Sequence, residues 1–160
     1  MQIGFENITR SEIPLGHPIL MFDAFWSGVS TDQKSACWSQ FNPMSMTFVL
    51  PWIVVLDCIQ DEDYMFRLCG TGCDRMFNRS LTGTKFSDQV DRKLAKARYD
   101  DLSMVKSGSG PLYAKGNLPV PDRDHVKVFR GLYGFTAGAD EINRLVLIIA
   151  PISEQNGQRY

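Results

Sequence analysis

The sequence predicts an α+β fold with one five-stranded antiparallel sheet, helices before its first strand and a helical insert after its second. Apolar and β-branched residues run almost unbroken from Ile53 to Ile59, as in a strand covered on both faces. The polar connection 61–63 separates this run from an alternating segment, Tyr64 to Cys69. Three further β-type segments complete the sheet, at residues 112–118, 126–135 and 144–152.

Two helices are predicted before the sheet. Pro18 suits the first turn of a helix, where a missing N–H costs nothing. Phe22 and Trp26 follow within an apolar stripe at helical spacing. A second short helix is expected to start at Thr31 or Asp32, either of which can cap its free N–H groups, and to end at Asn42-Pro43. Two large aromatic residues, Trp26 and Trp38, need a surface to pack on, which is either the back of the sheet or a second copy of the chain.

The segment between the second and third strands combines glycine turns with helices. Gly70 and Gly72 turn the chain into a short helix, with φ > 0 as one possibility, and Gly83 marks a second turn. Apolar residues then fall on one side of a helical wheel over 88–106. Asp101 lies inside this apolar sector, which indicates either a frayed edge or a carboxylate with a distant partner. A sheet edge that feeds a helical cap in this way can enclose a small ligand.

Composition argues against several classes of function. The formal charge is −1 and the basic residues are scattered, which disfavours a nucleic-acid partner. The longest apolar run, residues 48–56, is too short to cross a membrane, and no secretory signal opens the chain. No two of the four cysteines have the two-residue spacing of a zinc or redox motif. We therefore expect a reduced, cytosolic chain with buried thiols and no metal site.

Several motifs resemble a known family. Leu50-Pro51 precedes the first strand, the second strand ends in Arg67-Leu68-Cys69-Gly70-Thr71, and Leu81-Thr82-Gly83 follows the short helix. Together with Ala24-Phe25-Trp26 and the closing strand 147–153, these motifs resemble the bacterial single-domain PAS family found mostly in alphaproteobacteria. The segment 34–42 departs from that family, since it lacks an arginine- and proline-rich run.

The resemblance implies a PAS fold and a sensory or signalling role rather than a defined reaction. The expected division is an N-terminal tail at 1–17, a helical cap at 18–43, a PAS-like core at 47–153 and a C-terminal tail at 154–160. The expected partners are a small apolar or amphipathic ligand, a signalling protein and a second copy of the chain. Phe22 and Trp26 are the candidates for the contact with a partner or second copy.

No catalytic residue is assigned, and the candidate site is a ligand pocket. Aromatic residues of the sheet and helices either line a cavity with a phenolic hydrogen-bonding group or fill a core. The candidate pocket residues are Phe66, Leu68, Cys73, Met76, Phe77, Leu81, Tyr113, Phe129 and Tyr133.

Other functions remain as alternatives. A small cone-shaped enzyme, like ketosteroid isomerases or dehydratases, would need Asp57 or Asp101 as an acid or base in an apolar pocket. A phosphate-binding loop at Gly70-Thr71-Gly72 would lack its basic residue, so a structural turn is favoured.

A chromophore sensor is the third alternative. Cys73 is near a helix N-terminus, where a thiol pKa can be lowered, but its surroundings lack the amides that bind a flavin. The favoured interpretation of Cys73 is a small buried hydrophobe. His125 could ligate haem or act as a base, although an exposed loop histidine is commoner. We therefore expect no cofactor, neither flavin nor haem.

Overall fold

The sheet has the strand order β1-β5-β6-β7-β3-β4, and a short strand, β2, pairs with β6 in parallel. The computed structural model describes residues 4–154. The strands are β1 (Phe5–Ile8), β2 (Ala36–Cys37), β3 (Ile53–Cys58), β4 (Tyr64–Cys69), β5 (Leu112–Asn117), β6 (Lys127–Thr136) and β7 (Arg144–Pro151). The helices are α1 (Pro18–Val29), α2 (Thr71–Phe77), α3 (Phe86–Gln89) and α4 (Arg92–Lys106). Short 3₁₀ turns cover Arg10–Glu12, Trp38–Gln40, Pro43–Ser45 and Leu50–Trp52.

The predicted α+β fold is confirmed. Strands β5, β6, β7, β3 and β4 form a five-stranded antiparallel platform, and α2, α3 and α4 interrupt it after the β3–β4 hairpin. Each predicted strand is within two residues of its observed bounds. Antiparallel pairing follows from the short turns and the neighbouring hydrophobic runs, which favour hairpins.

The expected N-terminal tail is wrong over Phe5–Ile8, because this segment forms β1. It pairs antiparallel with β5, with Phe5 opposite Gly116 and Ile8 opposite Tyr113. An exposed sheet edge presents unpaired N–H and C=O groups, and β1 satisfies those of β5. The C-terminal tail expected at 154–160 lies outside the described residues after Glu154.

The second predicted N-terminal helix is also wrong. Asp32 and Gln33 have φ of 52° and 55°, so the chain reverses after α1 instead of continuing as a helix. Thr31 bridges Ser35 across this turn, and Ala36 then pairs with Phe135 of β6. Pairing with the open end of β6 satisfies backbone groups that a helix here would leave unpaired.

The long helix predicted over 88–106 starts at Arg92, and α3 is separate from it. The Asp91 side chain caps α4 by accepting a hydrogen bond from the Lys93 N–H at 2.8 Å. Val90 between the helices is extended. An aspartate at this position satisfies an N–H that has no partner within the helix, so the helix begins after Asp91 rather than at Asp88.

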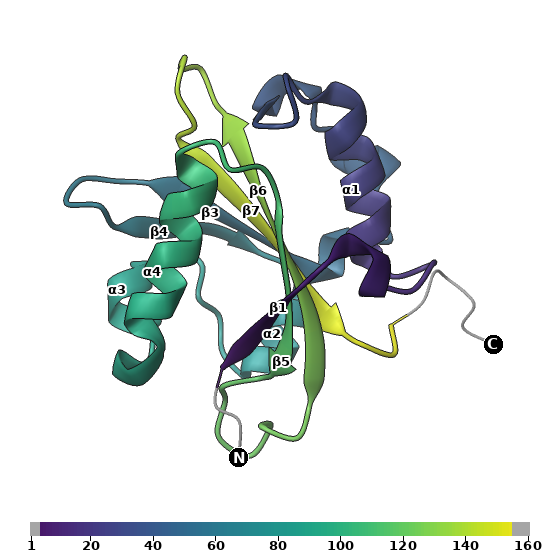
Figure 1. Cartoon of the computed structure of the whole chain (residues 1–160). Coiled ribbons are helices and arrows are strands. Elements are labelled where there is room, and N and C mark those ends of the chain that lie inside the picture. Colours follow the sequence, from purple (N-terminus) through teal and green to yellow (C-terminus); the bar gives the residue numbers. More distant parts are fainter. Residues whose placement is uncertain (1–3, 155–160) are drawn as a thin grey trace.

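Helix α1 lies on one side of the sheet, and α3 and α4 lie on the other (Figure 1). On the α1 side, Ile19, Phe22 and Trp26 are fully buried against the sheet. Trp26 also donates from Nε1 to the Gly134 carbonyl oxygen at 3.0 Å. This side is therefore closed by side chains of the chain itself.

The family-like motifs Leu50-Pro51 and Gly70-Thr71-Gly72 pack on each other. A Cβ at Gly70 would lie 2.1 Å from the Leu50 carbonyl oxygen, and one at Gly72 would lie 2.7 Å from the Trp52 ring. Gly70 has φ of −68°, so it is required for this close approach and not for a left-handed backbone. The prediction that these glycines turn the chain from strand into helix is therefore confirmed. The physical reason is close packing and not a positive φ.

Candidate functional site

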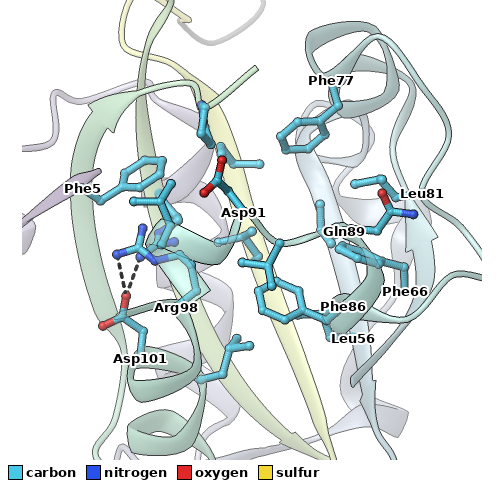
Figure 2. Close-up of a pocket in the computed structure, with 18 of the residues that line it drawn as sticks. Phe5, Leu56, Phe66, Phe77, Leu81, Phe86, Gln89, Asp91, Arg98 and Asp101 are labelled. Carbon is cyan, nitrogen blue, oxygen red and sulfur yellow. Dashed lines mark hydrogen bonds and ion pairs between the residues drawn. The ribbon is translucent and has the colours of Figure 1, made fainter. Parts of the chain in front are cut away.

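A cavity of about 310 Å³ lies between the sheet and helices α3 and α4 (Figure 2). Ligand sites in proteins usually measure about 300–1,000 Å³ and are mostly apolar. Alternation along the strands turns one set of apolar side chains towards the cavity. The sheet contributes Val54 and Leu56 from β3, Phe66 from β4, Leu132 from β6, and Leu147 and Ile149 from β7.

Helices and connecting loops close the cavity opposite the sheet. Phe86 of α3 packs edge-on against Tyr99, with ring centroids 5.2 Å apart, which holds α3 beside α4. The remaining apolar wall consists of Phe77, Leu81, Phe86, Val90, Leu94, Leu102, Pro119 and Val120. The side chains of most lining residues are therefore hydrocarbon.

A cluster of three charged side chains lies at one end of the cavity. Arg130 on β6 donates from Nη2 to Asp101 Oδ2 at 2.7 Å, and Arg98 Nη2 lies 3.3 Å from the same oxygen. Arg98 and Asp101 are three residues apart on α4, so they share one helix face. Arg130 and Leu132 are two residues apart on β6, so their side chains lie on the same face of the sheet, and both line the cavity.

Phe5 of β1 covers this charged end. The guanidinium carbons of Arg98 and Arg130 lie 4.9 Å and 4.3 Å from the centre of its ring. Aromatic faces attract cations, most strongly where water is excluded. The added edge strand therefore completes the cavity wall, since Phe5 is itself a lining residue.

The charged end carries more positive than negative charge. In the part of the chain that the structure describes, Asp101 is the only carboxylate paired with Arg98 or Arg130. Burial, followed by the positive charge of Arg98, lowers the Arg130 pKa to about 10 despite the opposing effect of Asp101. Burial likewise lowers the pKa of Arg98, whose Nε and Nη1 atoms are buried without a hydrogen-bond partner.

Two further charged residues line the cavity away from this cluster. Asp91 uses its carboxylate to cap α4, and Arg79 follows α2 on an exposed loop. The lining therefore holds three arginines and two aspartates, an excess of one positive charge.

A family model described as a PAS domain matches residues 16–133, which is most of the chain. The chain belongs to the PAS domain family. The match includes α1 through most of β6, and β7 completes the same sheet beyond it. PAS domains are sensory or signalling modules, so the family indicates that class of role. No curated protein matches the chain.

Three of the nine candidate pocket residues, Phe66, Phe77 and Leu81, line this cavity. Leu68 does not, because its side chain is 45% exposed. The β3–β4 register shifts between Val55 and Leu56, which places Phe66 opposite Leu56 but Leu68 opposite Val55. This bulge reverses the alternation that was expected to keep Leu68 on the face of Phe66.

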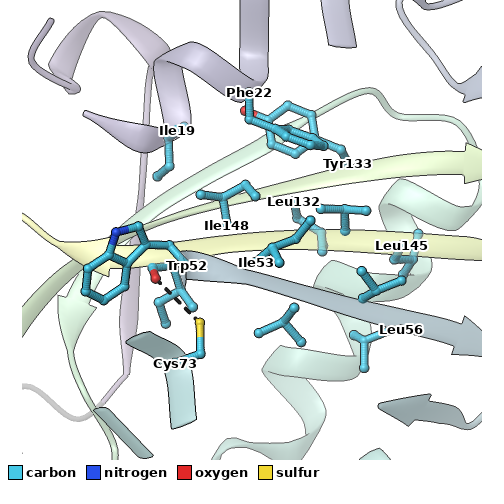
Figure 3. Packing of buried hydrophobic residues seen from close by; sticks show 14 of the residues in the cluster. Ile19, Phe22, Trp52, Ile53, Leu56, Cys73, Leu132, Tyr133, Leu145 and Ile148 are labelled. Carbon is cyan, nitrogen blue, oxygen red and sulfur yellow. Dashed lines mark hydrogen bonds between the residues drawn. The ribbon is translucent and has the colours of Figure 1, made fainter. Parts of the chain in front are cut away.

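Tyr113, Phe129 and Tyr133 lie on the α1 side of the sheet, away from the cavity. Figure 3 shows Tyr133 beside Phe22 of α1, while Cys73 and Leu56 lie across the sheet. Both tyrosine hydroxyls donate to Asp23 Oδ1, from Tyr133 at 3.1 Å. Successive residues of β6 face opposite sides, so Phe129 and Tyr133 point away from Arg130.

Cys73 and Met76 of α2 are buried but do not line the cavity. The Cys73 Sγ lies 3.9 Å from the Ile149 carbonyl oxygen, to which it donates (Figure 3). Burial raises the Cys73 pKa well above the ordinary thiol value, which disfavours the thiolate. The interpretation of Cys73 as a small buried hydrophobe holds, because burial outweighs the lowering effect of the Gly70 backbone at the helix N-terminus on its pKa. The cysteines are not all buried, because Cys37 is exposed.

Phe22 and Trp26, the expected contacts for a second copy or partner, have no exposed surface. Phe22 packs against Tyr133 with ring centroids 4.9 Å apart, and Trp26 lies 5.7 Å from the same ring. Both side chains therefore pack on the back of the sheet and not on a second copy of the chain. The assignment of their side chains to an intermolecular contact is wrong.

The other candidate residues are dispersed. Asp57 pairs with Arg144 at 2.6 Å and with Arg67 at 3.2 Å, and it does not line the cavity. Asp101 does line it, and its distant partner is Arg130. His125 is exposed on a loop.

Residues 4–154 contain no cluster of three or more histidine, cysteine, aspartate or glutamate residues that could hold a metal ion. None of the helices in this range is both long and apolar enough to span a membrane.

Sequence reasoning missed Phe5, Arg98 and Arg130. One signal was present for Arg130, which is the single charged residue between Val128 and Phe135 of an otherwise apolar or glycine-containing strand. Nothing in the sequence indicated a role for Phe5, because it precedes a polar segment that is typical of an N-terminal tail.

Proposed function

We propose that this PAS domain is a cytoplasmic sensory module that binds a small, mainly apolar ligand in the cavity under α3 and α4. The observation that carries the proposal is the cavity of about 310 Å³ with mainly hydrocarbon walls and a cluster of two arginines and one aspartate at one end. Protein interiors are normally packed to the density of organic crystals, so side chains such as Leu132 and Leu147 lack contacts on this side. A ligand of matching shape would supply them.

The contrast between the two sheet faces supports this role. The α1 face is filled by aromatic contacts, among them Phe22 with Tyr133 and Trp38 with Phe135 at 5.3 Å. On the opposite face, a cavity remains between the sheet and helices α3 and α4. A domain that needed only a stable core would gain from closing both faces. The open face favours a binding role over a purely structural one.

An isomerase- or dehydratase-like enzyme is the second candidate. Such chemistry needs an acid or base that can exchange a proton with a substrate. Asp101 is the pocket carboxylate nearest to that description, but it shares one oxygen between Arg98 and Arg130. Because both guanidiniums contact the same carboxylate oxygen, that oxygen is not free to contact a substrate. The charged cluster therefore favours ligand recognition.

The response is proposed to pass by contact to another signalling protein, with self-association as a further possibility. Free thiols at all four cysteines support a reducing compartment. The Leu50-Pro51, Arg67-Leu68 and Leu81-Thr82-Gly83 motifs support the narrower assignment to the bacterial single-domain family. We propose no flavin or haem, and an absorbance spectrum of the purified protein above the aromatic band tests this directly.

Leu94→Trp tests the proposal by filling the cavity from α4. Leu94 lines the cavity and is half-buried, so an indole there would occupy part of the volume. Ala97→Trp is the matched control, because Ala97 is exposed on the same helix and does not line the cavity. The probe is N-phenyl-1-naphthylamine, a neutral apolar dye that fluoresces when it leaves water.

The wild type and Ala97→Trp should bind the dye alike, and Leu94→Trp should bind it at least about tenfold more weakly. Circular dichroism checks that all three proteins are folded. Native mass spectrometry of the wild type reports any retained ligand and the oligomeric state together. Equal dye binding by Leu94→Trp would overturn the proposal that the cavity is the binding site.

A further inference from the structure

We infer that the cavity selects an amphipathic monoanion, a medium-length apolar chain that ends in one carboxylate, with the carboxylate at Arg98 and Arg130. This inference rests on the proposed function, because it names the ligand class of the same cavity. It is carried by the charge, the free donors and the position of the arginine cluster within the cavity.

The first argument is charge balance. Two guanidiniums, those of Arg98 and Arg130, share one oxygen of Asp101, so this cluster has an excess of one positive charge. A ligand with one negative charge would neutralise this excess, whereas a dianionic phosphate would reverse it. Charges enclosed by apolar walls interact more strongly than charges in water, so the imbalance has a large effect here.

The second argument is the number of unused hydrogen-bond donors. Arg130 donates one hydrogen bond, from Nη2 to Asp101, although a guanidinium carries five N–H groups. Arg98 approaches the same oxygen through Nη2, and its Nε and Nη1 are buried without a partner. Unpaired buried donors are costly. The planar fork of arginine matches a carboxylate with two parallel hydrogen bonds, which favours that head group.

The third argument is the separation of polar and apolar ends. Figure 2 shows Phe5, Arg98 and Asp101 on one side of the cavity, and Phe66, Phe77 and Phe86 on the other. A ligand with its head at the arginines would extend its tail towards these aromatic rings. The volume of about 310 Å³ is at the lower end of the range for ligand sites, which favours a medium-chain acid over a long lipid.

Decanoate and 1-decanol test the inference, because they share a chain length and differ in the head group. Their affinities are measured by displacement of N-phenyl-1-naphthylamine from the full chain. We expect wild-type protein to bind decanoate at least about tenfold more tightly than decanol, because the carboxylate can form charge-assisted hydrogen bonds with the guanidiniums and the neutral hydroxyl cannot form an ion pair.

Arg130→Met removes a guanidinium but keeps an extended apolar side chain. It should weaken decanoate binding about tenfold or more and leave decanol binding unchanged. Lys96→Met is the matched control, because Lys96 is exposed on α4 and pairs only with Asp100 among the described residues. It should leave both affinities unchanged. If Arg130→Met does not fold, Arg98→Met provides the same comparison.

The outcomes separate the inference from the proposed function. Equal wild-type affinities for decanoate and decanol would overturn the carboxylate assignment while leaving an apolar binding site. A preference for decanoate that survives both arginine substitutions would overturn the placement of the head group. Absence of dye, decanoate and decanol binding by folded wild-type protein would overturn the proposed function itself, and the inference with it.

Discussion

The His17 side chain joins the start of α1 to the end of β7, since its Nε2 donates to the Pro151 carbonyl oxygen at 3.0 Å. Its Nδ1 accepts from the Ile19 N–H at 3.2 Å and so caps the helix. One ring nitrogen donates and the other accepts, which requires the neutral imidazole with its proton on Nε2. His17 is fully buried, and burial lowers its pKa below the ordinary value of 6.5.

This arrangement predicts a loss of stability in mild acid. The unfolded chain takes up a proton at His17 as pH falls through 6.5, whereas the folded chain resists protonation until a lower pH. The contribution of His17 to stability is therefore complete above pH 6.5 and declines below it. Urea unfolding at a series of pH values measures the slope.

His17→Asn is the informative variant for this prediction. Asparagine caps helices but does not titrate, so the free energy of unfolding should fall less below pH 6.5 than in the wild type. His125→Asn makes the same substitution at an exposed loop position and is the matched control. A steeper decline in His17→Asn than in the wild type would show that the histidine does not carry the effect.

Trp26→Ala is expected to affect folding rather than association. The indole is fully buried, and its Nε1 donates to the Gly134 carbonyl oxygen. Removing a buried aromatic side chain costs about 3–5 kcal/mol of unfolding free energy. Urea unfolding measures this loss, and size-exclusion chromatography of the folded fraction over a concentration series measures association. Leu15→Ala, at an 89% exposed position, should change stability by less than about 0.5 kcal/mol.

The five strands β3 to β7 could be predicted from sequence because hydrophobic period and turn residues are local signals. The faces of β6 could not, since both are covered and both carry large apolar side chains. Phe129 and Tyr133 look as suitable for a pocket as Leu132 does. Only the packing of α1, more than a hundred residues earlier in the chain, decides that the two aromatic residues face it.

The charged end of the cavity illustrates a second limit of sequence reasoning. In the sequence, Asp101 is a carboxylate on the apolar side of its helix, and a distant partner was one of the two interpretations of this position. Its partner Arg130 is 29 residues away on another element, and Phe5 arrives from an added edge strand. Such contacts depend on tertiary pairing, which neither spacing nor composition encodes.

The same substitution at two glycines should change stability in opposite directions. Gly70→Ala would place a Cβ 2.1 Å from the Leu50 carbonyl oxygen, so backbone must move, at a cost on the order of 3 kcal/mol. Gly28 is exposed within α1 with nothing near its Cβ position, and Gly28→Ala should stabilise by about 0.5–1 kcal/mol. Thermal and urea unfolding measure both. Equal effects of the two substitutions would contradict the close packing of Gly70 on Leu50.

The thiols are expected to react in an order set by burial and pKa. Cys37 is exposed, and a hydrogen bond from Ser39 lowers its pKa, whereas burial raises the pKa of Cys69 to about 11 and that of Cys73 well above the usual range. Iodoacetamide at pH 8, followed by peptide mass spectrometry, should label Cys37 first and the two buried thiols only after unfolding. Cys37→Ser should abolish the fast phase. Rapid labelling of Cys73 in folded protein would instead mean that α2 opens readily and that this cysteine is available for redox chemistry.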